Sequence, residues 1–215
     1  MRIAAYVDGF SVYYACFKGP TKEPYVRYKW LDYRALFEAI FPDDDLFIVR
    51  VFTAIAPNSR DDPDQPTRHD TYVRALRARP GTEVYVGRFQ KSKREAVLAH
   101  PKAGMDSTQT VWIYQEKQSD VSLASHLIVD AVDGIFDRAV LLTNDSDFLE
   151  PVRIVRKRFG REVLILSPDV TISGALRKAA DAGRVLDRGL LAVCQLPDPV
   201  VGPDGREIFK PSRWT

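Results

Sequence analysis

Residues 139–148 read Ala-Val-Leu-Leu-Thr-Asn-Asp-Ser-Asp-Phe, and this stretch decides the fold. Its first four residues are uninterruptedly apolar, which is typical of a strand buried on both faces in a parallel sheet. A polar run containing Asp145 and Asp147 follows directly. Ligands of open parallel sheets bind beyond the carboxyl ends of the strands, so we expect chemistry at these acids.

Segments of strand length alternate with segments of helical period on both sides of this stretch. This alternation predicts an α/β fold: a three-layer, Rossmann-like domain with a central, mainly parallel sheet flanked by helices. The expected strands cover residues 3–7, 46–56, 83–89, 139–142 and 163–166, and the expected helices cover residues 10–17, 32–41, 68–79, 120–135, 148–159 and 173–180.

The chain of 215 residues is expected to form one domain over residues 1–196. Within it, residues 88–115 form an insertion or hairpin that returns through Val111 to Tyr114. Residues 197–215 are rich in Pro, Asp and Gly and predict a tail that folds back as a small hairpin through Ile208 and Phe209.

Composition is that of a globular protein, with 45% hydrophobic and 28% charged residues. No run approaches the roughly 18 apolar residues of a membrane span, and the first residues do not resemble a signal peptide, so we expect a cytoplasmic protein without membrane contact. Cys16 and Cys194 form no metal-ligand pair and are interpreted as core thiols. Monomer and homodimer both remain open.

Four aspartates occupy junctions between strands and helices. Asp8 directly follows the first strand, Asp120 opens a long helix, and Asp145 and Asp147 follow the strand quoted above. Carboxylates brought together repel one another unless a cation neutralises them, and hard oxygen ligands favour Mg²⁺ or Mn²⁺. The sequence therefore predicts an acidic metal site.

Each acid also has a purely structural interpretation. Asp8 would form a turn with Gly9, Asp120 would be a favourable charge in the first turn of its helix, and Asp147 would cap a helix with Glu150 completing a capping box. Any one acid alone is explained at least as well in this way. Three junctions of one sheet together favour the metal site.

At these residues the sequence resembles the NYN family, in particular its LabA-like branch of the PIN-like ribonucleases. The resemblance covers about residues 1–190. It rests on Tyr6-Val7-Asp8-Gly9-Phe10-Ser11-Val12-Tyr13-Tyr14, on Glu116-Lys117 with Asp120-Val121-Ser122-Leu123-Ala124, on Thr143 to Phe148, and on Ser173-Gly174-Ala175-Leu176-Arg177 with Asp181.

The resemblance implies a PIN-like fold and a metal-dependent ribonuclease or endoribonuclease, with Asp8, Asp120, Asp145 and Asp147 as the metal site. Asp8 and Asp145 would be direct ligands. Three positions depart from the family pattern: Ser11 stands in place of the usual Asn, Asn144 replaces Gly, and His126 occupies a position that is often acidic. Ser11 and Asn144 are expected to hold the metal ligands in place by hydrogen bonds without binding the metal themselves.

In the mechanism we expect, one or two Mg²⁺ or Mn²⁺ ions lower the pKa of a bound water and stabilise charge on the scissile phosphate. Asp120 and Asp147 would complete the metal shell or orient water. Lys117 would neutralise phosphate or the leaving oxygen, although a surface lysine paired with Glu116 is an equally good interpretation. His126 is expected to have a packing role.

RNA, including single-stranded RNA, is the expected partner. Its phosphates would be held by two basic clusters, which makes binding sensitive to salt. Tyr13, Tyr14 and Tyr28 are candidates for stacking on bases, although aromatics at such spacing are more often core. The clusters consist of Arg153, Arg156 and Lys157, and of Arg88, Lys91, Lys93 and Arg94.

Two alternatives keep the same fold. In the first, the protein would be an RNA-binding regulatory adaptor with little turnover. The departures from the family pattern at Ser11, Asn144 and His126 suggest this alternative. Otherwise it would be a metal-dependent phosphomonoesterase in which Asp8 is the nucleophile. Against this second alternative, position 10 is Phe10 and the first strand lacks a second aspartate two residues after Asp8.

Overall fold

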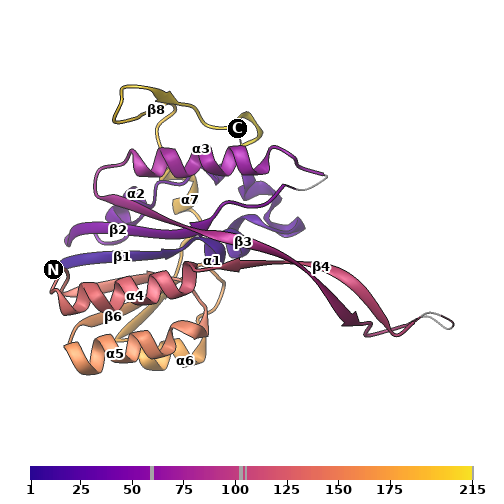
Figure 1. Ribbon diagram of the computed structural model, residues 1–215. Coiled ribbons are helices and arrows are strands. Elements are labelled where there is room, and N and C mark those ends of the chain that lie inside the picture. Colours follow the sequence, from indigo (N-terminus) through magenta and orange to yellow (C-terminus); the bar gives the residue numbers. More distant parts are fainter. Residues whose placement is uncertain (59–60, 102–103, 105, 215) are drawn as a thin grey trace.

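The computed structural model describes residues 1–58, 61–101, 104 and 106–214. In this part of the chain a seven-stranded sheet has the order β4-β3-β2-β1-β5-β6-β7, with β1 in the middle (Figure 1). All neighbours are parallel except β3 and β4. The strands are β1 (Arg2–Asp8), β2 (Asp45–Ala54), β3 (Thr82–Val97), β4 (Thr108–Lys117), β5 (Arg138–Leu142), β6 (Glu162–Ser167) and β7 (Ala182–Val185).

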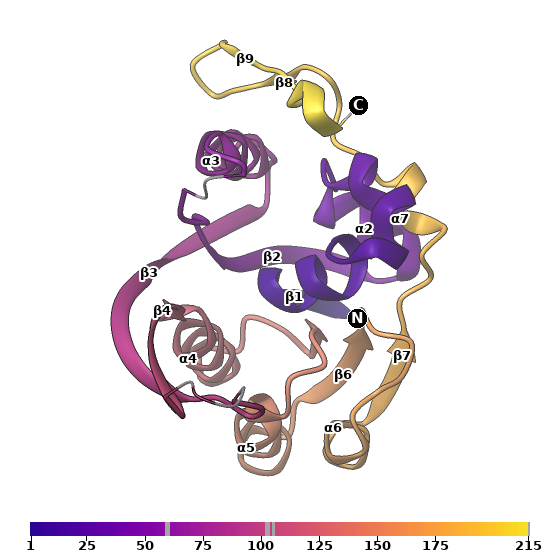
Figure 2. The same cartoon turned by 90° about the vertical axis from the view of Figure 1, so that its right-hand side faces the viewer.

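Helices cover both faces of the sheet, so the predicted three-layer α/β fold is confirmed (Figures 1 and 2). One layer holds α1 (Gly9–Val12), a π-helical turn (Tyr13–Phe17), a 3-10 helix (Pro20–Tyr28), α2 (Tyr33–Ile40), α3 (Gln65–Arg77) and α7 (Leu190–Val193). The other layer holds α4 (Ser119–Val132), α5 (Leu149–Phe159) and α6 (Gly174–Ala179). Among these described helices, none is long and apolar enough to cross a bilayer.

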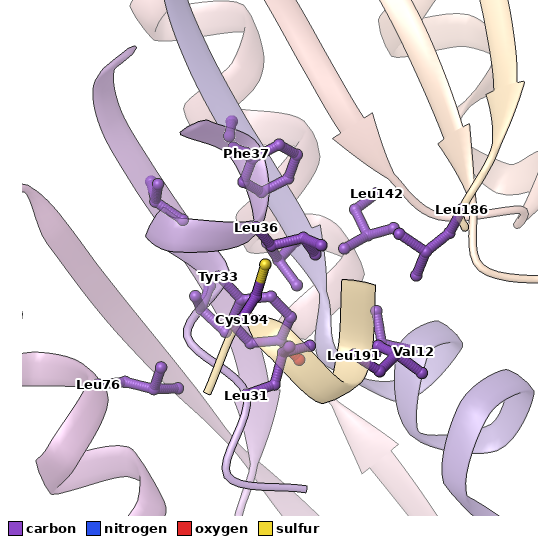
Figure 3. Close-up of a cluster of buried hydrophobic side chains, with 14 of the residues drawn as sticks. Val12, Leu31, Tyr33, Leu36, Phe37, Leu76, Leu142, Leu186, Leu191 and Cys194 are labelled. Carbon is purple, nitrogen blue, oxygen red and sulfur yellow. The ribbon is translucent and has the colours of Figure 1, made fainter. Parts of the chain in front are cut away.

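Alternation along β1 divides the buried side chains between two cores. Ile3, Ala5 and Val7 join one apolar cluster, and Ala4 and Tyr6 join the other. Successive side chains of a strand point to opposite faces, so a central strand that is apolar throughout must be covered on both sides. Figure 3 shows part of the first cluster, where α2 packs beside α7 and the ends of β1 and β5.

The chain order creates a switch point beside β1. From β1 the chain proceeds to β2, β3 and β4 on one side, and then α4 returns it to β5 on the other side of β1. The loops that follow β1 and β5 therefore diverge at their carboxyl ends. Open α/β sheets leave a crevice at such a point, and ligands bind there.

The insertion expected at residues 88–115 is a long antiparallel ribbon. β3 and β4 pair from Arg88 with Lys117 to Val97 with Thr108, and the ribbon projects away from the sheet (Figure 1). Its strands extend further than the sequence pattern indicated, because the outer half is polar on much of its surface and lacks the apolar runs of the buried strands. Residues 102, 103 and 105 lie outside the described residues.

The C-terminal segment contains the predicted small hairpin, β8 (Val200–Val201) paired with β9 (Glu207–Ile208). One detail differs from expectation. The last strand of the sheet is β7, which the sequence pattern did not predict because its edge position and Gly183 and Arg184 give it little apolar pattern. Cys16 and Cys194 are buried in the core, as predicted.

Candidate functional site

Asp8 is the last residue of β1 and is almost completely buried. Its Oδ1 accepts hydrogen bonds from the backbone N–H groups of Phe10 (3.1 Å) and Ser11 (3.0 Å), so it caps α1. A Cβ at Gly9 would lie 2.9 Å from the carbonyl oxygen of Phe52, and only glycine lets the chain turn so close to β2.

Two hydroxyl groups satisfy the other oxygen of Asp8. Oδ2 accepts hydrogen bonds from Ser11 Oγ (2.6 Å) and from Thr143 Oγ1 (2.9 Å). The two hydroxyl oxygens lie 3.2 Å apart. Thr143 Oγ1 also accepts from the backbone N–H of Asp145 at 3.1 Å, so one buried threonine joins the ends of β1 and β5. Ser11, which the sequence predicted to support the metal ligands, is thus hydrogen-bonded to Asp8.

Asp145 directly precedes the short 3-10 turn Ser146–Phe148, and Asp147 lies within this turn. Asp145 is half-buried and accepts a hydrogen bond from the backbone N–H of Asp147 at 2.9 Å, while Asp147 is exposed. The capping box suggested for Asp147 and Glu150 is wrong, because Asp145 caps the turn and α5 begins after Phe148 with no side-chain cap. The carboxylate of Asp147 faces solvent instead.

Asp120 enters from the opposite side of the crevice, in the first turn of α4. The preceding segment is sharply turned. Glu116 Oε1 accepts the backbone N–H of Ser119 at 3.1 Å, and Gln118 has a left-handed backbone with φ of 90°. Such a conformation is strained for a residue other than glycine, and strained backbone gathers at functional sites.

The electrostatics of Asp120 show that the charges of the other acids act on it. Its pKa is raised to about 6, first because the carboxyl group is partly desolvated, and then because neighbouring negative charges repel its ionised form. Those charges belong to Asp8, Glu116, Asp145 and Asp147, listed from the largest effect on the pKa to the smallest. Residues from β1, β4, α4 and the loop after β5 thus share one electrostatic environment.

The donor chemistry of this cluster fits a hard divalent cation, since all its ligand atoms are carboxylate or hydroxyl oxygens. As the side chains stand, no three His, Cys, Asp or Glu residues within the described ranges are arranged to hold a metal ion together. Mg²⁺ commonly binds through one or two carboxylates and completes its octahedron with water and substrate phosphate. The cluster offers the one or two carboxylates that such a site requires.

Asn144 points to a different neighbour from the one expected. Its Nδ2 donates to Asp169 Oδ2 at 2.9 Å, and its Oδ1 accepts the backbone N–H of Ser173 at 2.7 Å. It therefore fastens the loop between β6 and α6 to the site. Ser11, Asn144, Asp145 and Asp169 also line an open cavity of about 430 Å³.

The predicted cations divide between two places. Lys117 and Arg88 line a cavity at the base of the ribbon beside Ser119. Lys91, Lys93 and Arg94 lie further along the ribbon. Figure 1 shows that the ribbon leaves the sheet at the end of the molecule where β1 meets α1.

The basic cluster of α5 is not brought to the acids as a whole. This helix begins beside the acidic turn and runs about 16 Å along the sheet to Gly160, so its last turn lies toward the amino ends of the strands. There Arg156 binds Asp181 and the carbonyl oxygen of Ala179, and Lys157 is its neighbour. Arg153, nearer the start, pairs with Glu150 at 3.6 Å.

His126 has the packing role predicted for it. Its ring lies 4.1 Å from that of Tyr85 and 5.5 Å from that of Phe52, measured between centroids. Its Nδ1–H donates to the carbonyl oxygen of Ser122 at 2.8 Å.

Sequence reasoning missed Thr143, Glu116 and Asp169 as members of the site. Asp169 had a usable signal, because it follows the apolar strand β6 as Asp8 follows β1. Thr143 and Glu116 lie in segments that carry the family resemblance, but their roles depend on which backbone and side-chain groups face them.

Comparison with known proteins places this arrangement in a family. The model of the NYN domain matches residues 2–187. The chain is 27% identical over 245 aligned positions to 6-hydroxy-3-succinoylpyridine 3-monooxygenase HspA of Pseudomonas putida (strain DSM 28022 / S16), covering 100% of this chain and 75% of that protein.

The fold is also found in a solved structure. The crystal structure of VPA0982 from Vibrio parahaemolyticus RIMD 2210633, a protein of unknown function, superposes with a TM-score of 0.54 at 23% identity, covering 87% of this chain and 93% of that one. At this identity the likeness concerns the fold alone. The family match spans most of the sheet and every acid of the cluster. The chain belongs to the NYN domain family, which is part of the PIN-like ribonuclease superfamily.

Proposed function

We propose that this protein is a metal-dependent ribonuclease that hydrolyses phosphodiester bonds of RNA at the acidic site, with Mg²⁺ or Mn²⁺ as cofactor. One observation carries the proposal: the pKa of Asp120 is raised to about 6 by partial desolvation and by the charges of four other acids. So much negative charge at the switch point of a parallel sheet favours a bound cation. The LabA-like motifs support the same assignment.

Asp8 and Asp145 are the proposed direct ligands, and Asp120 and Asp147 complete the shell or orient the attacking water. When bound, the ion lowers the pKa of a water molecule and neutralises charge that develops on the scissile phosphate. Asp8 is held by the ends of β1 and α1, and Asp145 by the turn that it caps. Rigid backbone thus fixes both carboxylates before substrate arrives.

Asp8 requires a rearrangement before it can serve as a ligand. An ionised carboxylate has about four acceptor sites, and four hydrogen bonds already occupy those of Asp8. The hydroxyl groups of Ser11 and Thr143 lie 3.2 Å apart, close enough to bond to each other. We infer that one of them turns to the other when Asp8 binds the ion, which leaves no buried hydroxyl unsatisfied.

Lys117 is proposed to neutralise the phosphate or the leaving oxygen. It stands at the end of β4, three residues before Asp120, and is exposed at the cavity beside Ser119. Arg88, its partner across the ribbon, brings a second positive charge to the same place. These two cations offset the repulsion that the acids would exert on an approaching polyanion.

The geometry disfavours the phosphomonoesterase alternative. A nucleophilic Asp8 must itself reach the phosphorus of the substrate, whereas Asp8 is only 5% exposed. The ring of Phe10, two residues further on, packs edge-to-face against Phe89 at 5.7 Å and does not supply a second acid.

A cleavage assay with labelled single-stranded RNA tests the proposal. The parent chain, Asp145→Asn and the control Asp70→Asn are compared in Mg²⁺, in Mn²⁺ and in EDTA. Asp70 is an exposed acid of α3, paired with Arg74, so its substitution makes the same change of charge away from the site. We expect metal-dependent cleavage by the parent and the control, and a loss of at least 100-fold in Asp145→Asn.

Two results would decide against it. If the freshly purified parent binds RNA but cleaves none with either ion, the protein is the regulatory adaptor. If Asp145→Asn cleaves RNA as fast as Asp70→Asn, the activity comes from another site or from a contaminant. Phosphate trapped covalently on Asp8 would instead establish the phosphomonoesterase.

A further inference from the structure

The ribbon of residues 88–97 and 108–117, called the arm below, has two unlike faces. Paired residues of antiparallel strands share a face, and the faces alternate along each strand. On one face Phe89 pairs with Glu116, Lys91 with Tyr114, and Lys93 with Trp112. The other face carries Gln90, Ser92, Arg94 and Ala96 opposite Gln115, Ile113, Val111 and Gln109.

The first of these faces is connected to the acidic site. The ring of Phe89 packs against Phe10, which lines the open cavity beside Ser11 and Asp145. Glu116, opposite Phe89, is one of the acids that raise the pKa of Asp120. From this inner end the face continues outward along the projecting arm (Figure 1).

Exposed aromatic rings and lysines alternate on that face. Trp112 is 54% exposed and Tyr114 is 45% exposed. The Nζ of Lys91 lies 4.1 Å from the ring centre of Trp112 and 5.3 Å from that of Tyr114, and the Nζ of Lys93 lies 5.0 Å from Trp112. Each large ring is thus presented to solvent with an ammonium group beside it.

We propose that this face of the arm is a binding track for single-stranded RNA that leads the strand to the acidic site. The inference rests on the proposed ribonuclease function and names its substrate class. Bases stack on Trp112 and Tyr114, and Lys91 and Lys93 move from the rings to the adjacent phosphates. Aromatic platforms combined with cations are the usual means of holding unpaired nucleotides.

The spacing of the rings selects an unpaired strand. Side chains two residues apart on a strand are separated by about 6.8 Å, twice the rise of about 3.4 Å per nucleotide in a stacked duplex. Successive bases can reach successive rings only in a strand that is unstacked and extended. A duplex keeps its bases inside, so the rings would have nothing on which to stack.

Charge along the track agrees with this direction of binding. Lys91 and Lys93 lie in the middle of the face, whereas Arg88 and Lys117 lie at the inner end of the arm on its other face. Glu116 lies at the inner end, within the acidic cluster, and Glu95 lies beyond Trp112. A phosphate backbone therefore meets cations along the middle of the arm and the acids only where the proposed cofactor would neutralise them.

The protein supplies its own optical probe for the test. It has three tryptophans, and Trp30 and Trp214 are 1% and 8% exposed. Quenching of tryptophan fluorescence by a stacked base therefore reports on Trp112. The full chain in EDTA is titrated with a 12-nucleotide single-stranded RNA and with the same sequence as a duplex, at several salt concentrations, while anisotropy of the labelled RNA gives the affinity.

The single strand is expected to quench the fluorescence and to bind at least 10-fold more tightly than the duplex. Trp112→Ala should abolish the quenching and weaken binding about 10-fold, Trp112→Tyr should restore affinity, and Tyr114→Ala should weaken binding similarly. Lys91→Gln with Lys93→Gln should lower the slope of log K against log salt by about 1.4. Phe209→Ala and Lys178→Gln, exposed residues of the tail and of α6, are the matched controls.

Failure of the track and failure of the nuclease give different results. In Mn²⁺, Trp112→Ala and Tyr114→Ala should slow cleavage of the 12-nucleotide strand at least 10-fold more than cleavage of a dinucleotide, which is too short to span the track and the acids. RNA that binds and quenches but is never cleaved supports the track and refutes the nuclease. If correctly folded Trp112→Ala and Tyr114→Ala, checked by circular dichroism, bind and cleave long RNA like the parent, or if the duplex binds equally well, the track is wrong.

Discussion

The hydroxyl of Thr143 donates a hydrogen bond of 2.9 Å to Asp8 across the boundary between β5 and β1. The two residues are 135 positions apart, and both are almost inaccessible to water. Because Thr143 also accepts the backbone N–H of Asp145, it sets the positions of both proposed direct ligands. Groups that orient ligands in this way influence metal affinity nearly as much as the ligands do.

Thr143→Val should therefore damage the site without emptying space in the core. We expect Mn²⁺ affinity and RNA cleavage to fall by about 10- to 100-fold, and the free energy of unfolding to fall by about 2 kcal/mol, because a buried carboxylate loses a hydrogen bond. Isothermal titration with Mn²⁺ and urea unfolding measure the two effects. Thr67→Val, at an exposed position of α3, is the control, and equal Mn²⁺ affinity in both variants would contradict the role of Thr143.

The raised pKa of Asp120 makes the stability of the metal-free protein depend on pH. Its value of about 6 lies above the ordinary 3.8, so the folded protein holds more protons than the unfolded chain between about pH 4 and 6. The contribution of Asp120 to the free energy of unfolding therefore falls as pH rises through this window. A pKa change of this size corresponds to about 3 kcal/mol, which exposure to water reduces to about 1 kcal/mol.

Asp120→Asn removes this titration. In EDTA the variant should be more stable than the parent by about 1 kcal/mol at pH 7, and the difference should disappear near pH 4. Urea unfolding at several pH values gives the comparison, with Asp70→Asn as control. A variant that is less stable than the parent at pH 7 would show that the carboxylate of Asp120 is attracted to a cationic partner instead of being repelled.

Divalent ions should stabilise the folded chain if they bind among these acids. At a concentration 100 times the dissociation constant, a ligand of the folded state adds about 2.7 kcal/mol, which for a chain of this size raises Tm by about 5–10 °C. Thermal unfolding in Mn²⁺ and in EDTA measures the shift. Asp145→Asn should lose most of it and Asp70→Asn should retain it, whereas an equal shift in both would place the ion elsewhere.

A second acid of α4 has a structural role. Asp130 is buried, accepts a hydrogen bond from the hydroxyl of Tyr6 at 2.6 Å and pairs with Arg50 at 2.8 Å. Burial, together with the charge of Asp130, raises the pKa of Tyr6, so the phenol stays protonated and donates. Asp130→Ala should cost about 3–5 kcal/mol, because it leaves a partly buried cation without its partner.

Unfolding by urea checks this cost, and Tyr6→Phe should lose a smaller amount, about 2 kcal/mol. RNA cleavage per folded molecule should remain that of the parent in both variants. A large loss of activity in folded Asp130→Ala would mean that the acidic site extends along α4 to this residue.

The order of elements and the place of the acids were predictable from sequence. Period and length distinguish the apolar strands from the helices, and parallel strands bring their carboxyl ends to one edge. Asp8 ends β1 and Asp145 follows β5, so the sequence alone predicts that they lie at the same edge of the sheet. The core thiols Cys16 and Cys194 were recognised for a similar reason, since their neighbours lack ligand spacing.

Other properties depended on directions that no local pattern encodes. Asp120 and Asp130 lie on one helix, yet one faces the crevice and the other forms a buried ion pair. Arg156 was expected to contact RNA, but α5 carries it toward the far edge of the sheet, to Asp181. Whether a charged side chain faces the acidic site or forms an ion pair elsewhere depends on the packing angle of its helix.

The sequence by itself determined the fold and the edge of the sheet at which the acids gather, because the alternation of strands and helices fixes where each strand ends. Only the tertiary structure decided that Thr143 links Asp8 to Asp145 and that Trp112 faces solvent beside Lys91. Those relations follow from the register between strands distant in sequence and from the path of the arm. The physical reason is that a hydrogen bond or ring contact requires two groups within a few ångströms in the right orientation, and only folding brings them there.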